Sequence, residues 1–206
     1  MCLNYVTPPE LTAACLVALV KPVKSNKPYG FRPIAIGESL TRLLPSLIFN
    51  RFSTKARDYL KPFQFGIKTI EGASVASMTS DIFFNNKQHQ YIFNLDFKNA
   101  FNSVRRHCIY DVLLQEFPEL LAYFYLFYGK QSDLIFDTFT LESSFGVKQN
   151  DPLGPLLFCL AIHNIIEMTQ KESVLFFIWM IFKLSILMKA FVGFLKALAL
   201  NTKKLD

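Results

Sequence analysis

The chain contains 206 residues, of which 51% are hydrophobic, and it includes 22 phenylalanines. This composition supports a folded core and excludes a disordered chain. The formal net charge of +6 favours an acidic partner such as a nucleic acid, although a solvated basic face would give the same composition. Basic residues concentrate in the first third of the chain: Lys21, Lys24, Lys27, Arg32, Arg42, Arg51, Lys55, Arg57 and Lys61.

Local patterns divide the chain into helices and strands. The first half is expected to begin with a short helix capped by Thr7, a buried strand over 15–22 and a turn-rich hairpin that ends in a strand over 31–36. A helix over 39–60, interrupted by Pro45, and a loop over 62–74 are expected to follow. A helix over 74–86 and a strand over 91–98 complete this half. The second half is expected to hold two helices joined at Pro118, two short strands within 133–155 and a helix over 156–168. Interleaved helices and hairpins predict an α+β fold.

The cysteines and the N-terminus predict an intracellular protein, either nuclear or cytoplasmic. No charged segment followed by an apolar run and a cleavage site is seen at the start, so no secretory signal is expected. The cysteines lack the spacing of a zinc site and are expected to be small, buried and reduced. They are Cys2, Cys15, Cys108 and Cys159.

One carboxylate, Asp96, lies in the apolar, alternating stretch "YIFNLDFKNAFNSV" at 91–104. A carboxylate on a strand within an apolar protein is unfavourable unless a positive group meets it. Asp96 could cap a helix that follows the strand, or it could bind a metal ion. Its strand alone leaves both possibilities open.

Four segments decide between them, because they resemble motifs of the reverse transcriptase domain of non-LTR retroelements. "LDFKNAFNSV" is similar to motif A of that family and "GVKQNDPLGPLLFCLAI" to its motif B. "RPIAIGESLTRLL" and "LKPFQFGIKTIEGA" resemble two motifs of its fingers region. The likeness extends over most of residues 3–170, with the motifs in family order.

The resemblance implies the fingers and partial palm of a right-hand polymerase, with the thumb absent. Residues 1–90 would be the fingers-like region, 91–172 the partial palm, and 173–206 an out-of-frame apolar tail. The implied activity is that of an RNA-directed DNA polymerase, a nucleotidyltransferase that uses an RNA template, a DNA primer and deoxynucleoside triphosphates. The oligomeric state is left open.

Family roles transfer to six residues of this sequence. Two divalent ions, Mg²⁺ or Mn²⁺, would serve the transfer, and carboxylate oxygens are the ligands that such ions prefer. Asp96, with the backbone carbonyl of Phe97, matches the metal ligands of motif A. The positions expected to contact the nucleotide are Arg32 and Lys24 in the fingers, Phe101 as the gate against a ribose 2′-hydroxyl, and Gln149 in motif B.

The residues themselves leave alternatives open at these positions. Without the resemblance, Phe101 would be interpreted as a core residue and Gln149 as a residue of a solvated loop. Lys24, or Lys21 in its place, fits a plain surface role as well as a contact with the triphosphate. A planar guanidinium at Arg32 suits recognition of phosphate.

Two departures from the family pattern stand out. Asn150 replaces the glycine that usually follows the motif B glutamine, although asparagine tolerates left-handed backbone angles. The Tyr-x-Asp-Asp hairpin that supplies the remaining metal ligands is missing. Beyond Asp151, the acids are Glu167, Glu172 and Asp206. The chain as written is therefore expected to be inactive.

The genetic code gives a reason for the missing motif. Tryptophan and methionine have one codon each and every isoleucine codon begins AT, so Trp179-Met180-Ile181 requires the bases TGGATGAT. In the frame that starts at the third base of each codon, these bases read GAT GAT and encode Asp-Asp. The same frame places Leu or Met directly before this pair, and Tyr or His one position earlier. The reading frame is therefore expected to slip between about Lys171 and Phe177.

Residues 174–200 support a different interpretation if they are taken literally. They are apolar enough to suggest a membrane helix or an interfacial helix, although Lys183, Lys189 and Lys196 interrupt them. A membrane is not expected as a partner, because an out-of-frame segment explains the same residues. Two alternatives to an inactive polymerase domain therefore remain: a non-catalytic basic protein that binds nucleic acid, and an interaction protein anchored in a membrane through 174–200.

Overall fold

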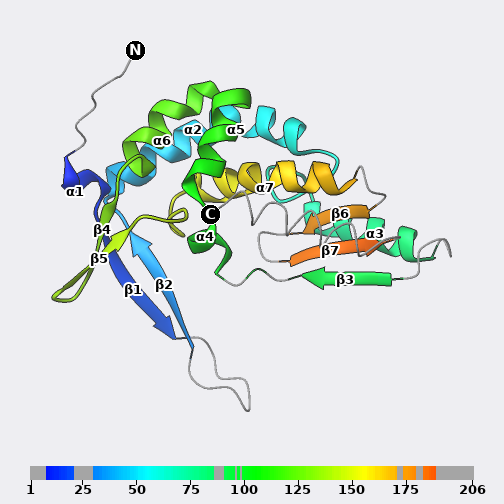
Figure 1. The fold of residues 1–206 in the computed structure, drawn as a ribbon, viewed down its shortest axis with the longest axis horizontal. Coiled ribbons are helices and arrows are strands. Elements are labelled where there is room, and N and C mark those ends of the chain that lie inside the picture. The colour runs from blue at the N-terminus through cyan, green and yellow to red at the C-terminus, as the bar shows by residue number, and fades with distance from the viewer. Residues whose placement is uncertain are drawn as a thin grey trace. The chain divides into compact units, whose positions relative to one another are not determined.

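The computed structural model describes residues 8–20, 30–85, 91–95, 97, 99–170, 174–179 and 183–188. The chain divides into two units (Figure 1). The first unit comprises Met1–Asn50 and Phe101–Leu157, and the second comprises Arg51–Ala100 and Phe158–Asp206. Each unit is built from segments that are far apart in the sequence. The division into 1–90, 91–172 and 173–206 stays a prediction.

A four-stranded sheet, in the order β2-β1-β4-β5, forms the first unit's strand layer (Figure 1). Its strands are β1 (Ala14–Val20), β2 (Phe31–Ile36), β4 (Ser132–Phe136) and β5 (Phe139–Ser143). β1 pairs antiparallel with β2 and parallel with β4, and β4 pairs antiparallel with β5. The sheet thus joins the N-terminal hairpin to a segment more than a hundred residues later.

The expectation that the first strand is buried is wrong for most of its length. Ala14 is buried, but Leu19 and Val20 at the other end of β1 are exposed. A continuous apolar run fills a buried strand only where both faces of the sheet are covered. The expected strand at 31–36 and the two short strands within 133–155 are confirmed.

Helices pack their apolar side chains into the first unit's core. They are α4 (Ala100–Ser103), α5 (Arg106–Glu116), the 3₁₀ turn η1 (Pro118–Leu120) and α6 (Leu121–Tyr128). The short α1 (Pro9–Thr12) buries none of its residues. Pro118 opens η1, which confirms the expected joint between two helices. Ile109, Leu113 and Phe117 are fully buried.

The helix expected at 39–60 is confirmed as α2 (Ser39–Leu60), but it is not interrupted by Pro45. A proline inside a helix removes one N–H donor and crowds the preceding turn. The other hydrogen bonds of this 22-residue helix stabilise it on both sides of Pro45. One turn is reinforced by Ser46, whose hydroxyl donates to the carbonyl oxygen of Arg42 over 2.8 Å.

The second unit contains a three-stranded antiparallel sheet, in the order β3-β7-β6 (Figure 1). Its elements are α3 (Gly72–Asn85), β3 (Tyr91–Leu95), β6 (Val174–Trp179) and β7 (Lys183–Met188), and α7 (Gly154–Gln170) contributes its later residues. α3 contacts β6 and β7. The expected helices at 74–86 and 156–168 are confirmed, each beginning about two residues earlier than the pattern indicated.

Residues 174–188 differ from the single apolar helix of the membrane interpretation. Their described parts are the two strands β6 and β7. Among the residues that the structure describes, no helix has the length and apolar character needed to cross a membrane.

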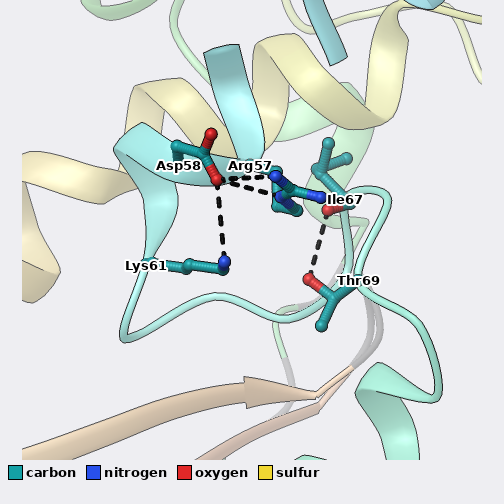
Figure 2. A network of polar contacts seen from close by, with 5 residues as sticks. All are labelled: Arg57, Asp58, Lys61, Ile67 and Thr69. Atoms are coloured by element: carbon teal, nitrogen blue, oxygen red, sulfur yellow. Dashed lines mark hydrogen bonds and ion pairs between the residues drawn. The ribbon is translucent and has the colours of Figure 1, made fainter. Parts of the chain in front are cut away.

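Ion pairs join charged side chains at the C-terminal end of α2, which belongs to the second unit. Figure 2 shows Arg57 and Lys61 both pointing toward the carboxylate of Asp58, at 2.9 and 3.6 Å. The hydrogen bond from Arg57 lowers the pKa of Asp58 below its ordinary value. In the loop that follows, the Thr69 hydroxyl donates to the carbonyl oxygen of Ile67 over 3.3 Å.

A buried polar cluster fixes the same loop to α7. The side-chain amide of Gln64 donates to the carbonyl oxygen of Cys159 over 2.9 Å and lies 3.1 Å from Nδ1 of His163. Gln64, Cys159 and His163 are almost completely buried, and burial raises the pKa of the Cys159 thiol to about 12. The expectation of buried cysteines is thus confirmed at Cys159, but it is wrong at Cys15, which is exposed. Cys2 lies outside the described residues.

Candidate functional site

The loop that carries Gln149 is joined by two main-chain hydrogen bonds to α4 and to the residue that follows it. We refer to residues 144–153, between β5 and α7, as the Gln149 loop. The N–H of Gly146 donates to the carbonyl oxygen of Val104 over 2.9 Å, and that of Val147 donates to Phe101 over 2.8 Å. The segments resembling motifs A and B therefore meet in the first unit.

Gly146 makes this close approach possible. Its φ of +69° lies in the left-handed region, and a Cβ at this position would stand 2.3 Å from the carbonyl oxygen of Phe101. Only glycine adopts such a backbone without steric cost. The glycine at the start of the motif B segment is therefore required by geometry.

The Gln149 loop borders a groove with a volume of about 250 Å³. Polar side chains of Asn102, Glu142 and Gln149 line it together with apolar side chains of β1, β2 and β4. The full lining is Leu16, Pro33, Ala35, Asn102, Leu134, Glu142, Ser143, Ser144, Phe145, Val147, Lys148 and Gln149. A mostly apolar groove with a few polar groups is the usual form of a small-ligand site.

Asp151 anchors the far end of the loop. Its carboxylate accepts hydrogen bonds from the hydroxyls of Tyr123, over 2.8 Å, and of Tyr128. It also accepts the main-chain N–H of Leu153 over 2.8 Å, just before α7 begins. Burial raises the pKa of Asp151, and burial followed by the nearby carboxylate raises the pKa values of both tyrosines.

Lys148 connects the loop to the N-terminal segment. Its ammonium donates to the carbonyl oxygen of Thr12, and its main-chain N–H donates to the Tyr128 hydroxyl over 3.3 Å. Burial, followed by the positive charge of Arg106, lowers the pKa of Lys148 to about 8, while Asp151 opposes this shift.

The turn survives the replacement of the usual glycine by Asn150. The N–H of Asp151 donates to the carbonyl oxygen of Lys148 over 3.1 Å, and the N–H of Gly154 donates to that of Asp151 over 2.9 Å. Asn150 is not among the described residues with positive φ. The turn therefore does not use the left-handed angles that asparagine tolerates.

The structure places four of the six predicted site residues. Gln149 lines the groove, and Phe101 lies directly beside the loop, with its side chain only 8% exposed. Arg32 is an exposed residue of β2, where Pro33, and not Arg32, belongs to the groove lining. Phe97 is exposed.

The expected metal site cannot be assembled from described residues. Asp96 and Lys24 lie outside the part of the chain that the structure describes. Within that part, no group of three or more Asp, Glu, His or Cys side chains is placed to hold a metal ion. The metal-binding role of Asp96 therefore stays a prediction.

Sequence reasoning missed the residues that support the Gln149 loop. The sequence predicted only that Arg106, Tyr123 and Tyr128 lie in the two helices joined at Pro118. Asp151 belongs to the quoted motif B segment, and an Asp-Pro pair before a helix is a recognisable start signal. The tyrosines offered no comparable local signal, because their partner is more than twenty residues away.

The fold of the chain is shared with a solved structure of telomerase. A structure of apo telomerase from Candida tropicalis, truncated from its C-terminal domain, matches 94% of this chain and 47% of its own length, with a TM-score of 0.58 and 12% identity. A likeness at this identity establishes the fold alone. It confirms a mixed fold of helices and sheets.

The family follows from the sequence. The family model of the reverse transcriptase (RNA-dependent DNA polymerase) matches residues 22–184. The chain therefore belongs to the reverse transcriptase family, as the reverse transcriptase domain of a non-LTR retroelement.

Two curated relatives come from retrotransposable elements. The chain is 28% identical over 177 residues to the retrovirus-related Pol polyprotein from type-2 retrotransposable element R2DM of Drosophila melanogaster. It is 27% identical over 179 residues to the corresponding polyprotein from type-1 retrotransposable element R2 of Popillia japonica. Each alignment covers 80% of this chain but only 16% and 24% of the respective relatives. The chain thus spans less than a quarter of the length of either relative.

Proposed function

We propose that this chain derives from an RNA-directed DNA polymerase that extends a DNA primer along an RNA template with deoxynucleoside triphosphates. The observation that supports this most directly is the hydrogen bond from Val147 to Phe101, which brings the two expected nucleotide-contacting segments together beside one groove. In this proposal the first 90 residues serve as fingers and residues 91–172 as a partial palm, without a thumb.

The proposed roles follow the position of each residue. Gln149 contacts the incoming nucleotide from the groove. Phe101 limits the space for a ribose 2′-hydroxyl, while Arg32 and Lys24 meet the triphosphate. Asp96, with the carbonyl of Phe97, would contribute one carboxylate to Mg²⁺ or Mn²⁺, which in this family neutralises charge during nucleotidyl transfer.

We infer that the chain as written does not polymerise DNA. Asp96 supplies a single carboxylate, and the sequence lacks the Asp-Asp pair. The pairing of β3 with β7 and of β7 with β6 supports a frame slip. The shifted Asp-Asp codons begin within the codon of Trp179, the last residue of β6. A hairpin beside the strand that precedes Asp96 is the place such a pair would occupy.

Primer extension on an RNA template tests this proposal. Three chains are compared, with Mg²⁺ and then with Mn²⁺: the chain as written, a frame-corrected chain, and the corrected chain carrying Asp96→Asn. We expect extension only by the corrected chain. Extension by the chain as written would refute the proposed inactivity, and full activity of corrected Asp96→Asn would refute the metal role of Asp96.

A second candidate function is binding of nucleic acid without chemistry. Arg32, Arg42, Arg51 and Lys55 are exposed on β2 and α2, and exposed basic side chains bind phosphate independently of catalysis. Affinity of the unaltered chain for an RNA–DNA duplex that falls steeply with salt would support this function. An affinity that does not depend on salt would contradict it.

A further inference from the structure

Arg106, the first residue of α5, donates all of its side-chain hydrogen bonds to uncharged groups. A guanidinium has five N–H donors in a rigid fork. Here five acceptors are within reach: Gly146 O at 3.1 Å, Tyr128 O at 3.4 Å, Lys130 O at 3.3 Å, Ser143 Oγ at 3.0 Å and Phe145 O at 3.4 Å.

These acceptors belong to three segments that converge on the groove. Tyr128 and Lys130 mark the end of α6, Ser143 ends β5, and Phe145 and Gly146 begin the Gln149 loop. The guanidinium therefore ties the start of the loop to the helix that also holds its other end, since Tyr128 donates to Asp151. The Tyr128 ring lies beneath the guanidinium, 5.3 Å from its carbon.

The environment of Arg106 is unusual for a cation. Its side chain is partly buried, burial lowers its pKa, and no carboxylate is among its hydrogen-bond partners within the described chain. Placing a charge in such an environment is unfavourable unless its donors are all satisfied. An arginine that served only as a surface charge would not need this arrangement.

We propose that Arg106 is a positioning residue that holds the Gln149 loop in the conformation in which Gln149 faces the groove. This inference rests on the proposed contact between Gln149 and the nucleotide. Arg106 itself does not line the groove, so it acts through the main chain of the loop. A lysine cannot replace it, because a single ammonium cannot reach five acceptors in three segments.

Hydrogen exchange of the Gly146 and Val147 amides, hydrogen-bonded to Val104 and Phe101, measures the loop directly. We expect Arg106→Lys to increase their exchange rates at least about tenfold, because hydrogen bonds to a charged group are lost. Ser143→Ala, which removes one acceptor, should have a smaller effect. The Gln64 amide in the second unit, bonded to Leu60, is the internal control, and Arg51→Lys on α2 is the matched variant. Exchange of the loop amides within twofold of the unaltered chain would overturn the proposal.

Chemical rescue separates positioning from general stability. Arg106→Ala leaves a space of guanidinium shape, so added guanidinium should restore slow exchange in that variant and not in Arg106→Lys. Failure of rescue in a folded Arg106→Ala chain would count against the proposal.

Nucleotide binding tests the link to Gln149. With primer–template and a deoxynucleoside triphosphate, Arg106→Lys and Gln149→Ala should both weaken nucleotide binding at least about tenfold, whereas only Arg106→Lys should loosen the loop. Nucleotide affinity unchanged in Arg106→Lys would overturn the positioning role. Affinity unchanged in Gln149→Ala would instead overturn the proposed function of Gln149, and the exchange data would still report on Arg106.

Discussion

The main-chain N–H of Val147 donates to the carbonyl oxygen of Phe101 over 2.8 Å. This one bond joins α4 to the Gln149 loop, although the two residues are 46 positions apart in the sequence. Both side chains are buried, so the bond is held in an apolar environment, where breaking it leaves polar groups unsatisfied. The geometry beside the groove therefore depends on main-chain contacts that close packing permits.

Gly146→Ala should disrupt this junction. The added Cβ would stand 2.3 Å from the Phe101 oxygen at a φ of +69°, and strain of this kind costs about 1–3 kcal/mol or more. We expect the free energy of unfolding, measured with urea, to fall by at least about 2 kcal/mol. Gly66→Ala is the matched control, because a Cβ there meets nothing within 4 Å. Equal stability of the two variants would contradict the assigned role of Gly146.

Tyr128→Phe should destabilise the loop through Asp151. The variant keeps the ring but removes a hydroxyl that donates to the buried carboxylate and accepts the N–H of Lys148. Hydrogen bonds to a charged group contribute about 1.5–3 kcal/mol, so the free energy of unfolding should fall by about 2 kcal/mol. Tyr125→Phe on the same helix is the control, since Tyr125 is 53% exposed. A negligible loss in Tyr128→Phe would show that Asp151 is stabilised by other groups.

The lowered pKa of Lys148 predicts that its contribution to the stability of the fold rises with pH. Burial lowers its folded-state pKa to about 8, below the ordinary lysine value of 10.5, so between these values the unfolded chain binds more protons than the folded chain. Stability must then increase with pH in this window. We expect the difference in unfolding free energy between the unaltered chain and Lys148→Met to grow by about 1–2 kcal/mol from pH 7 to pH 9.5.

The control for this measurement is Lys68→Met, which alters an exposed lysine. Its difference from the unaltered chain should stay constant over the same pH range. Parallel stability curves for Lys148→Met and the unaltered chain would mean that the Lys148 ammonium is well solvated in the folded state.

Much of the fold could be predicted from sequence, because its signals are local. Apolar periodicity gave α2 and α7, and Pro118 marked a joint between helices. Pro45 was over-interpreted, since a long helix tolerates one missing hydrogen bond. The parallel pairing of β1 with β4 had no local signal, because it depends on contacts between distant segments.

In the candidate site, too, the sequence predicted the residues that lie in recognisable motifs and missed those defined by contacts between distant segments. Gln149 and Phe101 were predicted by family motifs, and the structure brings their segments together. Arg106 and the two tyrosines were not predicted, because nothing in the sequence near them indicates that they meet carbonyl or carboxylate oxygens 20 to 40 residues away. Supporting residues are defined by tertiary structure, whereas residues that contact substrate are often recognisable in short motifs.

Gln64→Met should show how strongly the buried polar cluster ties its loop to α7. Methionine fills similar space but removes the amide that donates to the Cys159 carbonyl and lies 3.1 Å from Nδ1 of His163. Because these partners are buried, losing their donor should lower the free energy of unfolding by about 1–3 kcal/mol.

The matched control is Gln115→Met, which makes the same chemical change on the exposed side of α5. An exposed substitution of this kind usually changes stability by less than about 0.5 kcal/mol. Oε1 of Gln64 is buried without a hydrogen-bond partner in the described chain, and methionine relieves that cost. A Gln64→Met chain as stable as Gln115→Met would mean that this relief offsets both lost contacts, and that the cluster specifies the loop conformation without stabilising it.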